Sequence, residues 1–156
     1  MHVLLSVKPE FALGILSGSK KYEYRRTMFR STAVESVFMY ASSPMQALVG
    51  EFRVAHVLSD EPSKLWAKTR DESGICETEF TKYFEGATVG YAMRVTDVRR
   101  FPYPLDLGES LGIRPPQSYC FIDDSSVELV RRASRDRQPL PLPSICQPIS
   151  QALGDA

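Results

Sequence analysis

The sequence has few of the residues that usually hold metal ions or form disulfides. It contains three cysteines, Cys76, Cys120 and Cys146, and two histidines, His2 and His56. A zinc site needs ligands paired about two to four residues apart, and a disulfide framework needs an even set of cysteines. Neither pattern is present. The sequence therefore predicts no metal site and no cofactor, and the cysteines are expected to be core or incidental surface residues.

Long apolar runs and an excess of one charge are also missing. No stretch is apolar and long enough to cross a membrane, and the first residues lack the basic start and apolar core of a signal peptide. A cytoplasmic protein is therefore expected. The formal net charge of +0 argues against a protein that coats nucleic acid indiscriminately. The 156 residues suit one domain that buries most of its apolar surface.

The charge is nevertheless unevenly placed along the chain. Residues 1–30 hold six cations and two glutamates, whereas residues 60–85 lean acidic. A compact basic face on a neutral protein is compatible with a small or local anionic target. The six cations are Lys8, Lys20, Lys21, Arg25, Arg26 and Arg30.

Apolar periodicity predicts more strands than helices. Strands are expected at 2–7, 20–26, 35–41, 48–58, 87–101 and 119–122, and helices at 9–17, after Asp60, after Cys76 and at 124–133. This order predicts an α+β fold, a PUA-like curled β-barrel of mostly antiparallel strands with flanking helices. The domain is expected to span residues 1–134. Residues 135–156 hold four of the eleven prolines, which predicts a draped or disordered extension.

Residues 18–26, Gly-Ser-Lys-Lys-Tyr-Glu-Tyr-Arg-Arg, are the segment most informative about function. In an extended strand, alternate residues point to opposite faces. One face would carry Lys21, Glu23 and Arg25. The other would carry Lys20, Tyr22, Tyr24 and Arg26. A solvated surface strand can hold such charges without any function, and a site for an anionic ligand is the alternative. The spacing leaves both open.

Four residues of this segment resemble the signature of the ASCH domain family, whose members have a PUA-like β-barrel fold. Gly18, Lys20, Glu23 and Arg25 match Gly-x-Lys-x-x-Glu-x-Arg, and they follow the first strand and helix, as in the family. Further segments look like family members: Ser6–Pro9, Val49–Phe52 and Gly90–Ala92. The resemblance covers residues from about 2 to about 122. Because a regular strand cannot place Lys20 beside Glu23 and Arg25, either a bulge or turn after Gly18 presents Lys20 from the loop, or the site uses residues from both faces of a strand end. We expect the former.

The resemblance implies that RNA or a nucleotide-derived ligand binds in a basic cleft lined by the signature. It also implies catalysis as an alternative, because some ASCH proteins are amidohydrolases of acylated cytidine and others are ribonucleases. The amidohydrolases use a lysine, a threonine and a glutamate. By position, the lysine corresponds to Lys20 and the glutamate to Glu51. Glu23 stands where the amidohydrolases have the threonine, so their hydroxyl nucleophile is missing.

The residue types themselves support roles in phosphate binding. A lysine supplies a point charge and an arginine a bidentate fork, while a tyrosine can stack a base or simply pack in the barrel. Lys8, at the end of the first strand, can reach the same cleft or be a solvated cation. Arg114, in the stiff segment before the last strand, can rim the cleft or belong to a closing loop. The predicted ligand-binding residues are Lys8, Lys21, Tyr22, Arg25 and Arg26.

Lys20, Glu23 and Glu51 are the catalytic candidates. Burial would lower the pKa of a lysine and a neighbouring carboxylate would raise it, so two nearby glutamates favour a charged Lys20. A glutamate would then act as a general base that activates water, with Lys20 stabilising the developing oxyanion.

The sequence favours RNA or modified-nucleotide binding through the basic cleft. The alternatives are a hydrolase of a nucleoside amide or of RNA phosphodiesters, and a protein-interaction module that keeps the fold without the chemistry. A second basic run is typical of a solvated helix face, with an RNA-contacting extension as its alternative. It consists of Arg131, Arg132, Arg135 and Arg137.

Overall fold

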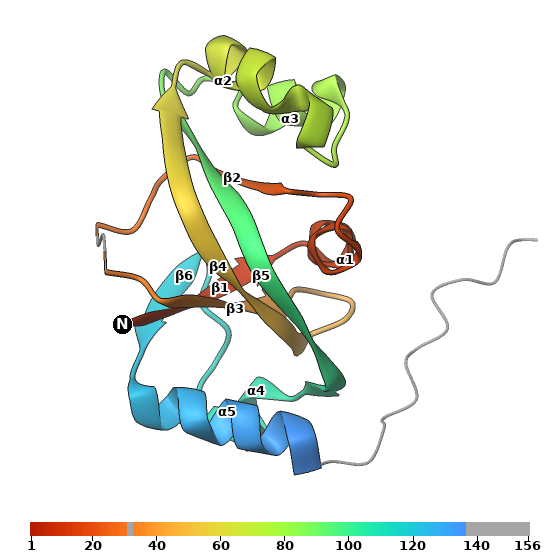
Figure 1. Ribbon diagram of the computed structural model, residues 1–156, viewed down its shortest axis with the longest axis vertical. Helices are drawn as coiled ribbons and strands as arrows, with labels where there is room; N and C mark the ends of the chain where they lie inside the picture. The colour runs from red at the N-terminus through yellow and green to blue at the C-terminus, as the bar shows by residue number, and fades with distance from the viewer. Residues whose placement is uncertain (31–32, 137–156) are drawn as a thin grey trace, which may run out of the picture.

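The computed structural model describes residues 1–30 and 33–136 (Figure 1). Most of the predicted extension, residues 137–156, lies outside the described residues. The strands are β1 (His2–Val7), β2 (Tyr22–Arg25), β3 (Ser36–Ala41), β4 (Ala47–Asp60), β5 (Gly90–Leu105) and β6 (Tyr119–Ile122). The helices are α1 (Pro9–Ser17), α2 (Pro62–Thr69), the 3₁₀ turn η1 (Arg70–Glu72), α3 (Glu77–Tyr83), α4 (Leu107–Leu111) and α5 (Asp124–Asp136).

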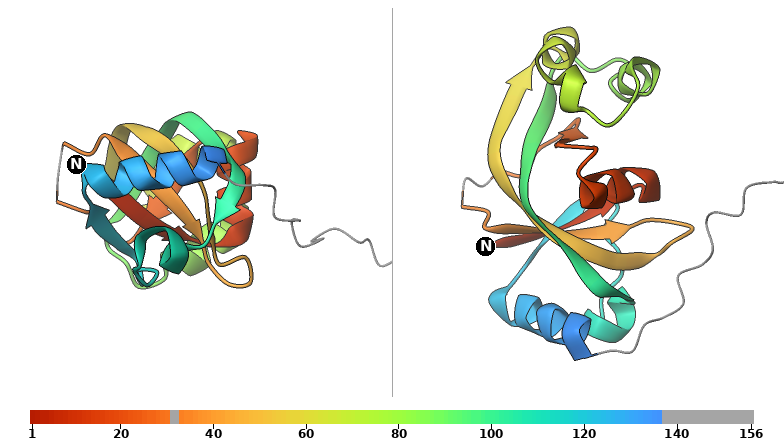
Figure 2. Two further views of the ribbon diagram at one scale, coloured as in Figure 1. Left: turned by 90° about the horizontal axis from the view of Figure 1, so that it is seen from below. Right: turned by 45° about the vertical axis from the view of Figure 1, so that its right-hand side comes forward.

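The strands form one six-stranded sheet in the order β2-β5-β4-β3-β1-β6. All neighbours are antiparallel except β1 and β3, which are parallel. The long strands β4 and β5 run side by side through the molecule, with α2 and α3 at one end and α4 and α5 at the other (Figures 1 and 2). The sheet curls into a half-barrel, which confirms the predicted α+β fold.

Alternation along β1 gives the sheet two apolar faces. Val3 and Leu5 pack with Ile15 of α1 on one face. Leu4 packs with Phe38 and with apolar side chains of α5 on the other. Figure 2 shows α1 and α5 on opposite sides of these central strands. A third apolar cluster lies under α2 and α3, so α3 is held against the end of the sheet where β2 lies. Within residues 1–30 and 33–136, no helix is long and apolar enough to cross a membrane.

Local signals account for most of the helix ends. Gly18 has a φ of 83° and ends α1 in the left-handed conformation that glycine favours. Cys76 N–H donates to Glu79 at 3.1 Å, which is one half of a capping box at the start of α3. At α2 the cap is Glu61 rather than the expected Asp60, whose carboxylate instead accepts from Glu61 N–H at 2.8 Å.

The region after Phe101 differs from the prediction, in which the strand ends at residue 101. β5 continues to Leu105, and α4 follows it, capped by Asp106, which accepts from the Glu109 N–H at 2.8 Å. The sequence does not predict this part of the strand, because Pro102 and Pro104 lie in it and proline is unfavourable inside a sheet. Here they are tolerated since β2 pairs only with Tyr91–Arg94, so the far end of β5 has a strand partner on one side only.

Candidate functional site

Lys20 reaches its place from the turn between α1 and β2, as expected from the sequence. The strand begins only at Tyr22, and the main chain before it is fixed on both sides. Lys20 N–H donates to Gly14 O of α1, and Lys21 N–H donates to Glu72 O, each at 3.0 Å. Glu23 and Arg25 then follow from β2 itself, and alternation along the strand puts both on one face.

The side chain of Lys20 runs through a narrow passage between two glycines. A Cβ atom on Gly74 would lie 2.5 Å from Lys20 Cβ, and one on Gly14 would lie 3.1 Å from it. These distances leave no room for a side chain at Gly74 and little at Gly14. Lys20 is therefore only 2% exposed, which is unusual for a lysine.

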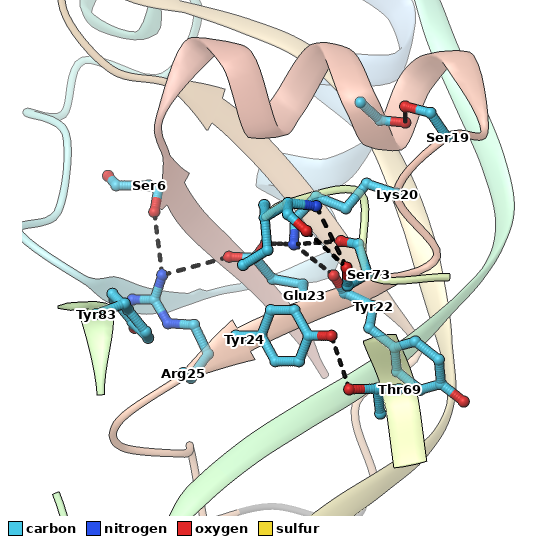
Figure 3. A network of polar contacts seen from close by, with 12 residues as sticks. Ser6, Ser19, Lys20, Tyr22, Glu23, Tyr24, Arg25, Thr69, Ser73 and Tyr83 are labelled. Carbon is cyan, nitrogen blue, oxygen red and sulfur yellow. Dashed lines mark hydrogen bonds and ion pairs between the residues drawn. The ribbon is translucent and has the colours of Figure 1, made fainter. Parts of the chain in front are cut away.

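The ammonium group of Lys20 has polar and aromatic neighbours (Figure 3). Nζ donates to Tyr22 O and, at 3.4 Å, to Ser73 O. It also lies 5.2 Å from the ring centre of Phe11 and 4.6 Å from that of Tyr24. Main-chain carbonyls and ring faces thus replace water around the charge.

Glu23 links Lys20 to Arg25. Its carboxylate lies 3.6 Å from Lys20 Nζ and 3.8 Å from Arg25 Nη1, and the residue is 3% exposed. Arg25 donates to Ser6 O at 3.3 Å and to the hydroxyl of Ser118. A buried carboxylate therefore lies between two cations (Figure 3). The arginine also joins β2 to the end of β1 and to the segment before β6.

Burial lowers the pKa of Lys20 below its ordinary value of 10.5, although Glu23 acts in the opposite direction. The sequence predicts a charged lysine, because neighbouring carboxylates raise the pKa of a lysine. In the structure the effect of burial on the pKa of Lys20 is larger than that of the carboxylates, because the ammonium is enclosed. Besides Glu23, the carboxylate that acts on it is Glu79 of α3.

These groups border a cavity of about 360 Å³, which we call the signature cavity. It lies between β2, the end of β1, α1 and α3. Lys8, Lys20, Glu23, Arg25 and Arg26 are the sequence-predicted site residues that line it.

Other predicted ligand-binding residues lie elsewhere or serve packing. Lys21 pairs with Glu72 at 3.2 Å, and Tyr22 lies under Arg94, with 5.0 Å from the guanidinium carbon to the ring centre. Neither residue lines the signature cavity. Arg26 lines it, but its guanidinium donates to Tyr83 O and Glu85 O at 2.9 Å each, which fastens β2 to the end of α3.

Tyr24 lines the cavity with a ring that is otherwise packed. Its hydroxyl donates to Thr69 at 2.8 Å, and its ring meets Phe80 edge-on with centres 5.0 Å apart. Burial raises the pKa of Tyr24 to about 12. The ring therefore belongs to the core under α2 and α3 more than to a base-stacking surface.

Glu51 does not join Lys20 in the signature cavity. It pairs in register with Phe38, whose side chain belongs to the α5 face of the sheet. There Arg131 donates to both carboxylate oxygens, at 3.2 and 2.7 Å. Since the signature cavity lies on the α1 side, the two glutamates serve different sites.

Further residues outside the sequence-predicted set also line the signature cavity. Glu79 and Tyr83 come from α3, and Ser6 and Ser118 hold Arg25. Neither Glu79 nor Tyr83 is among the sequence-predicted site residues. The stiff segment before β6 reaches the cavity through Gln117 and Ser118, whereas Arg114 does not line it. Ser6 fixes this segment, because its hydroxyl donates to Pro116 O at 2.6 Å and its N–H to Ser118 O at 2.9 Å.

The curled sheet and the signature, with its lysine, glutamate and arginine meeting in one cavity, match an ASCH domain of PUA-like fold by sequence and by structure. No family model matches the chain. An ASCH domain-containing ribonuclease of Zymomonas mobilis is 28% identical over 123 residues, which are 76% of this chain and 82% of that protein.

Solved structures give the same fold. The crystal structure of ASCH from Zymomonas mobilis matches with a TM-score of 0.78 and 24% identity, covering 84% of this chain and 94% of that one. The N-terminal domain of McrB from Staphylothermus marinus matches with a TM-score of 0.54 and 13% identity, over 84% of this chain and 93% of that one.

Proposed function

We propose that this protein binds RNA in the signature cavity and cleaves its phosphodiester bonds. The observation that carries the proposal is the pair of buried groups, Glu23 and Lys20, 3.6 Å apart beside Arg25 in one cavity. Such a pair can take up and release a proton, and an arginine fork suits a phosphate. Similarity to a Zymomonas mobilis protein named a ribonuclease supports RNA as the substrate.

In the proposed reaction, Glu23 accepts the proton of the ribose 2′-hydroxyl while the 2′-oxygen forms a bond to phosphorus. The bond from phosphorus to the 5′-oxygen breaks, and Lys20 gives this oxygen a proton. The products are a 2′,3′-cyclic phosphate and a 5′-hydroxyl. Because the two side chains are 3.6 Å apart, the proton on Glu23 then returns to Lys20 and restores the starting state.

The surroundings suit these roles. The lowered pKa of Lys20 makes its ammonium a stronger acid than an ordinary lysine, and so a better proton donor to a leaving oxygen. Arg25 and the exposed Lys8 line the same cavity and are the groups proposed to hold the phosphate. Charges that the protein holds in fixed positions can stabilise the charge that develops on a reacting phosphate.

Glu23→Gln tests the proton transfer, because it keeps the shape of the side chain and removes the base. We expect cleavage of a labelled single-stranded RNA to fall about 100-fold or more, while RNA binding persists. The control is Glu72→Gln, since Glu72 also pairs with a lysine and an arginine but does not line the cavity. Mass spectrometry should find the cyclic phosphate. If Glu23→Gln cleaves RNA as fast as the control, the catalytic assignment is wrong.

Arg25→Ala tests the binding step separately. RNA affinity should fall and lose part of its salt dependence, because one phosphate contact is removed. Arg30→Ala is the matched control, since Arg30 is exposed and does not line the cavity. Equal RNA affinity in Arg25→Ala and Arg30→Ala would contradict the proposal that Arg25 binds an RNA phosphate in the signature cavity. No turnover of acylated cytidine is expected, because Glu23 stands in place of the threonine nucleophile.

A further inference from the structure

A second buried glutamate forms a charged cluster on the α5 side of the sheet. Glu51 is 5% exposed and accepts two hydrogen bonds from Arg131, at 3.2 and 2.7 Å. Arg99 Nη1 lies 3.6 Å from the same carboxylate. Two guanidinium groups thus converge on one negative charge, which leaves the group with a net positive charge.

A cavity of about 310 Å³ opens beside this cluster, and we call it the arginine cavity. Its charged lining consists of Glu51, Arg53, Asp97, Arg99 and Arg131. The positive charges outnumber the negative ones, and they are accessible: the side chain of Arg99 is 70% exposed and Arg53 is an exposed residue. None of these residues lines the signature cavity.

The main chain is shaped around this cavity. Glu51 pairs with Arg99 and Arg53 pairs with Thr96, so β5 has one residue more than β4 between the two pairs. Asp97 lies in this bulge with a φ of 48°, in the left-handed region that residues other than glycine rarely adopt. Bulges redirect side chains, and such conformations cluster at functional sites.

The arrangement favours a phosphate group over other ligands. Glu51 holds Arg131 and Arg99 close together, and Ser36 accepts a further hydrogen bond from Arg131 at 3.3 Å. The single negative charge of Glu51 offsets only one of these two positive charges, so a further anion with several acceptor oxygens would neutralise the excess. Phosphate has the charge and the geometry for two or three such forks.

We propose that the arginine cavity is a second phosphate-binding site, in which Arg53, Arg99 and Arg131 bind the phosphate and Glu51 is a positioning residue. Where the phosphate belongs to RNA, the proposal rests on the proposed function and gives the bound strand a contact beyond the signature cavity. A free phosphate presents the same chemistry, so the experiment must distinguish the two sources.

The decisive measurement is a titration of the protein with inorganic phosphate and with pyrophosphate, followed by NMR of the arginine side-chain N–H groups. We expect shifts at Arg99 and Arg131, and about tenfold weaker binding in Arg99→Ala. The matched control is Arg100→Ala, because Arg100 is exposed and adjacent on β5 but does not line the cavity. Thermal unfolding checks that both variants fold.

Absence of shifts in the wild type, or equal phosphate affinity in Arg99→Ala and Arg100→Ala, would overturn the proposal. A parallel titration with single-stranded RNA identifies the source. If the phosphate comes from RNA, Arg99→Ala weakens RNA binding more than Arg100→Ala and reduces the salt slope by about one. If only phosphate binding weakens, the site takes a free phosphate. If the wild type binds phosphate but no RNA, the proposed function fails and this site stands.

Discussion

Glu23 and Glu51 are both buried, and each lies beside two cations. The closest cation has a lowered pKa at Glu23 and a raised pKa at Glu51. At Glu23, burial lowers the pKa of Lys20. At Glu51, hydrogen bonds to the carboxylate raise the pKa of Arg131, and burial acts in the opposite direction. The side chain of Lys20 is 1% exposed and that of Arg131 is 33% exposed, so solvent access decides which effect wins.

This difference separates two kinds of chemistry. An enclosed lysine whose pKa is lowered can exchange a proton with its carboxylate, as the proposed cleavage requires. An arginine stays charged at any relevant pH, so it can bind anions but not transfer protons. Similar ion pairs on the two faces of one sheet therefore suit a reaction on one face and binding on the other.

The largest loss of stability is expected from a substitution that disrupts the packing around Lys20 and leaves Glu51 and its arginines unchanged. Gly74→Ala places a Cβ atom 2.5 Å from Lys20 Cβ, at a residue with a φ of 67°. Left-handed strain and this overlap together should lower the free energy of unfolding by about 2–5 kcal/mol. Urea unfolding measures the change.

Gly86→Ala is the matched control for Gly74→Ala. Gly86 has a φ of 77°, and nothing lies within 4 Å of an added Cβ atom. It should therefore lose only the left-handed preference, about 1–2 kcal/mol. Equal losses in the two variants would mean that the passage around Lys20 is not tightly packed.

A moderate effect is expected from breaking the Glu51 pair. Arg131→Ala leaves the buried carboxylate with Arg99 alone, at 3.6 Å. Loss of a fully buried partner costs about 3–5 kcal/mol, and the partial exposure of Arg131 reduces the expected loss to about 1–2 kcal/mol. Arg132→Ala, next along the helix, removes an exposed pair with Asp136 at 4.0 Å and should cost less than about 0.5 kcal/mol. Similar unfolding midpoints for Arg131→Ala and Arg132→Ala would contradict the expected contribution of the Glu51–Arg131 pair.

The smallest effect at neutral pH is expected from Tyr24→Phe, which loses the hydrogen bond to Thr69 and about 1 kcal/mol. The sharper signal comes at alkaline pH. At a pH between the ordinary tyrosine pKa of 10.0 and the Tyr24 pKa of about 12 in the folded protein, the unfolded chain has released a proton that the folded protein keeps. Stability therefore falls as pH rises through this window, and Tyr24→Phe should remove that part of the slope.

Unfolding free energies measured between neutral pH and pH 12 test this expectation. Tyr91→Phe, at a half-buried tyrosine of β5, controls for the loss of one phenol group. An alkaline slope that is the same in Tyr24→Phe and in the wild type would show that the ring is not enclosed as described.

Proton transfer at the signature cavity also has a pH signature. Since the pKa of Lys20 is lowered from 10.5, cleavage should begin to fall at a lower pH than it would with an ordinary lysine as the acid. Above that pKa the rate should drop about tenfold per pH unit. Lys20→Arg, which keeps the charge but does not titrate there, should remove this limb from whatever activity remains. If the rate of Lys20→Arg falls with rising pH as in the wild type, a group other than Lys20 donates the proton to the leaving oxygen.

The bounds of β1, α1 and β6 follow the sequence prediction closely, because alternation, a first-turn proline and a terminal glycine act over a few residues. The position of Lys20 in the turn was also predictable, since a regular strand cannot place it on one face with Glu23 and Arg25. Glu51 could not be assigned to a face, because that depends on how β4 pairs with Phe38 on β3. Ser118 reaches Arg25 from 93 residues away, which no local pattern reveals.

The pairing of β1 with β6 has a consequence for how the protein is made. His2 lies opposite Ile122, and Leu5 opposite Tyr119, so the first strand stays without one neighbour until the chain is synthesised beyond residue 122. Contacts this distant in sequence slow folding, and an open strand edge invites pairing with other chains. A nascent chain that stalls before residue 118 would therefore lack both β6 and Ser118, the hydroxyl partner of Arg25, and expose an apolar edge. Completion of the sheet and completion of the signature cavity are thus the same late event in biosynthesis.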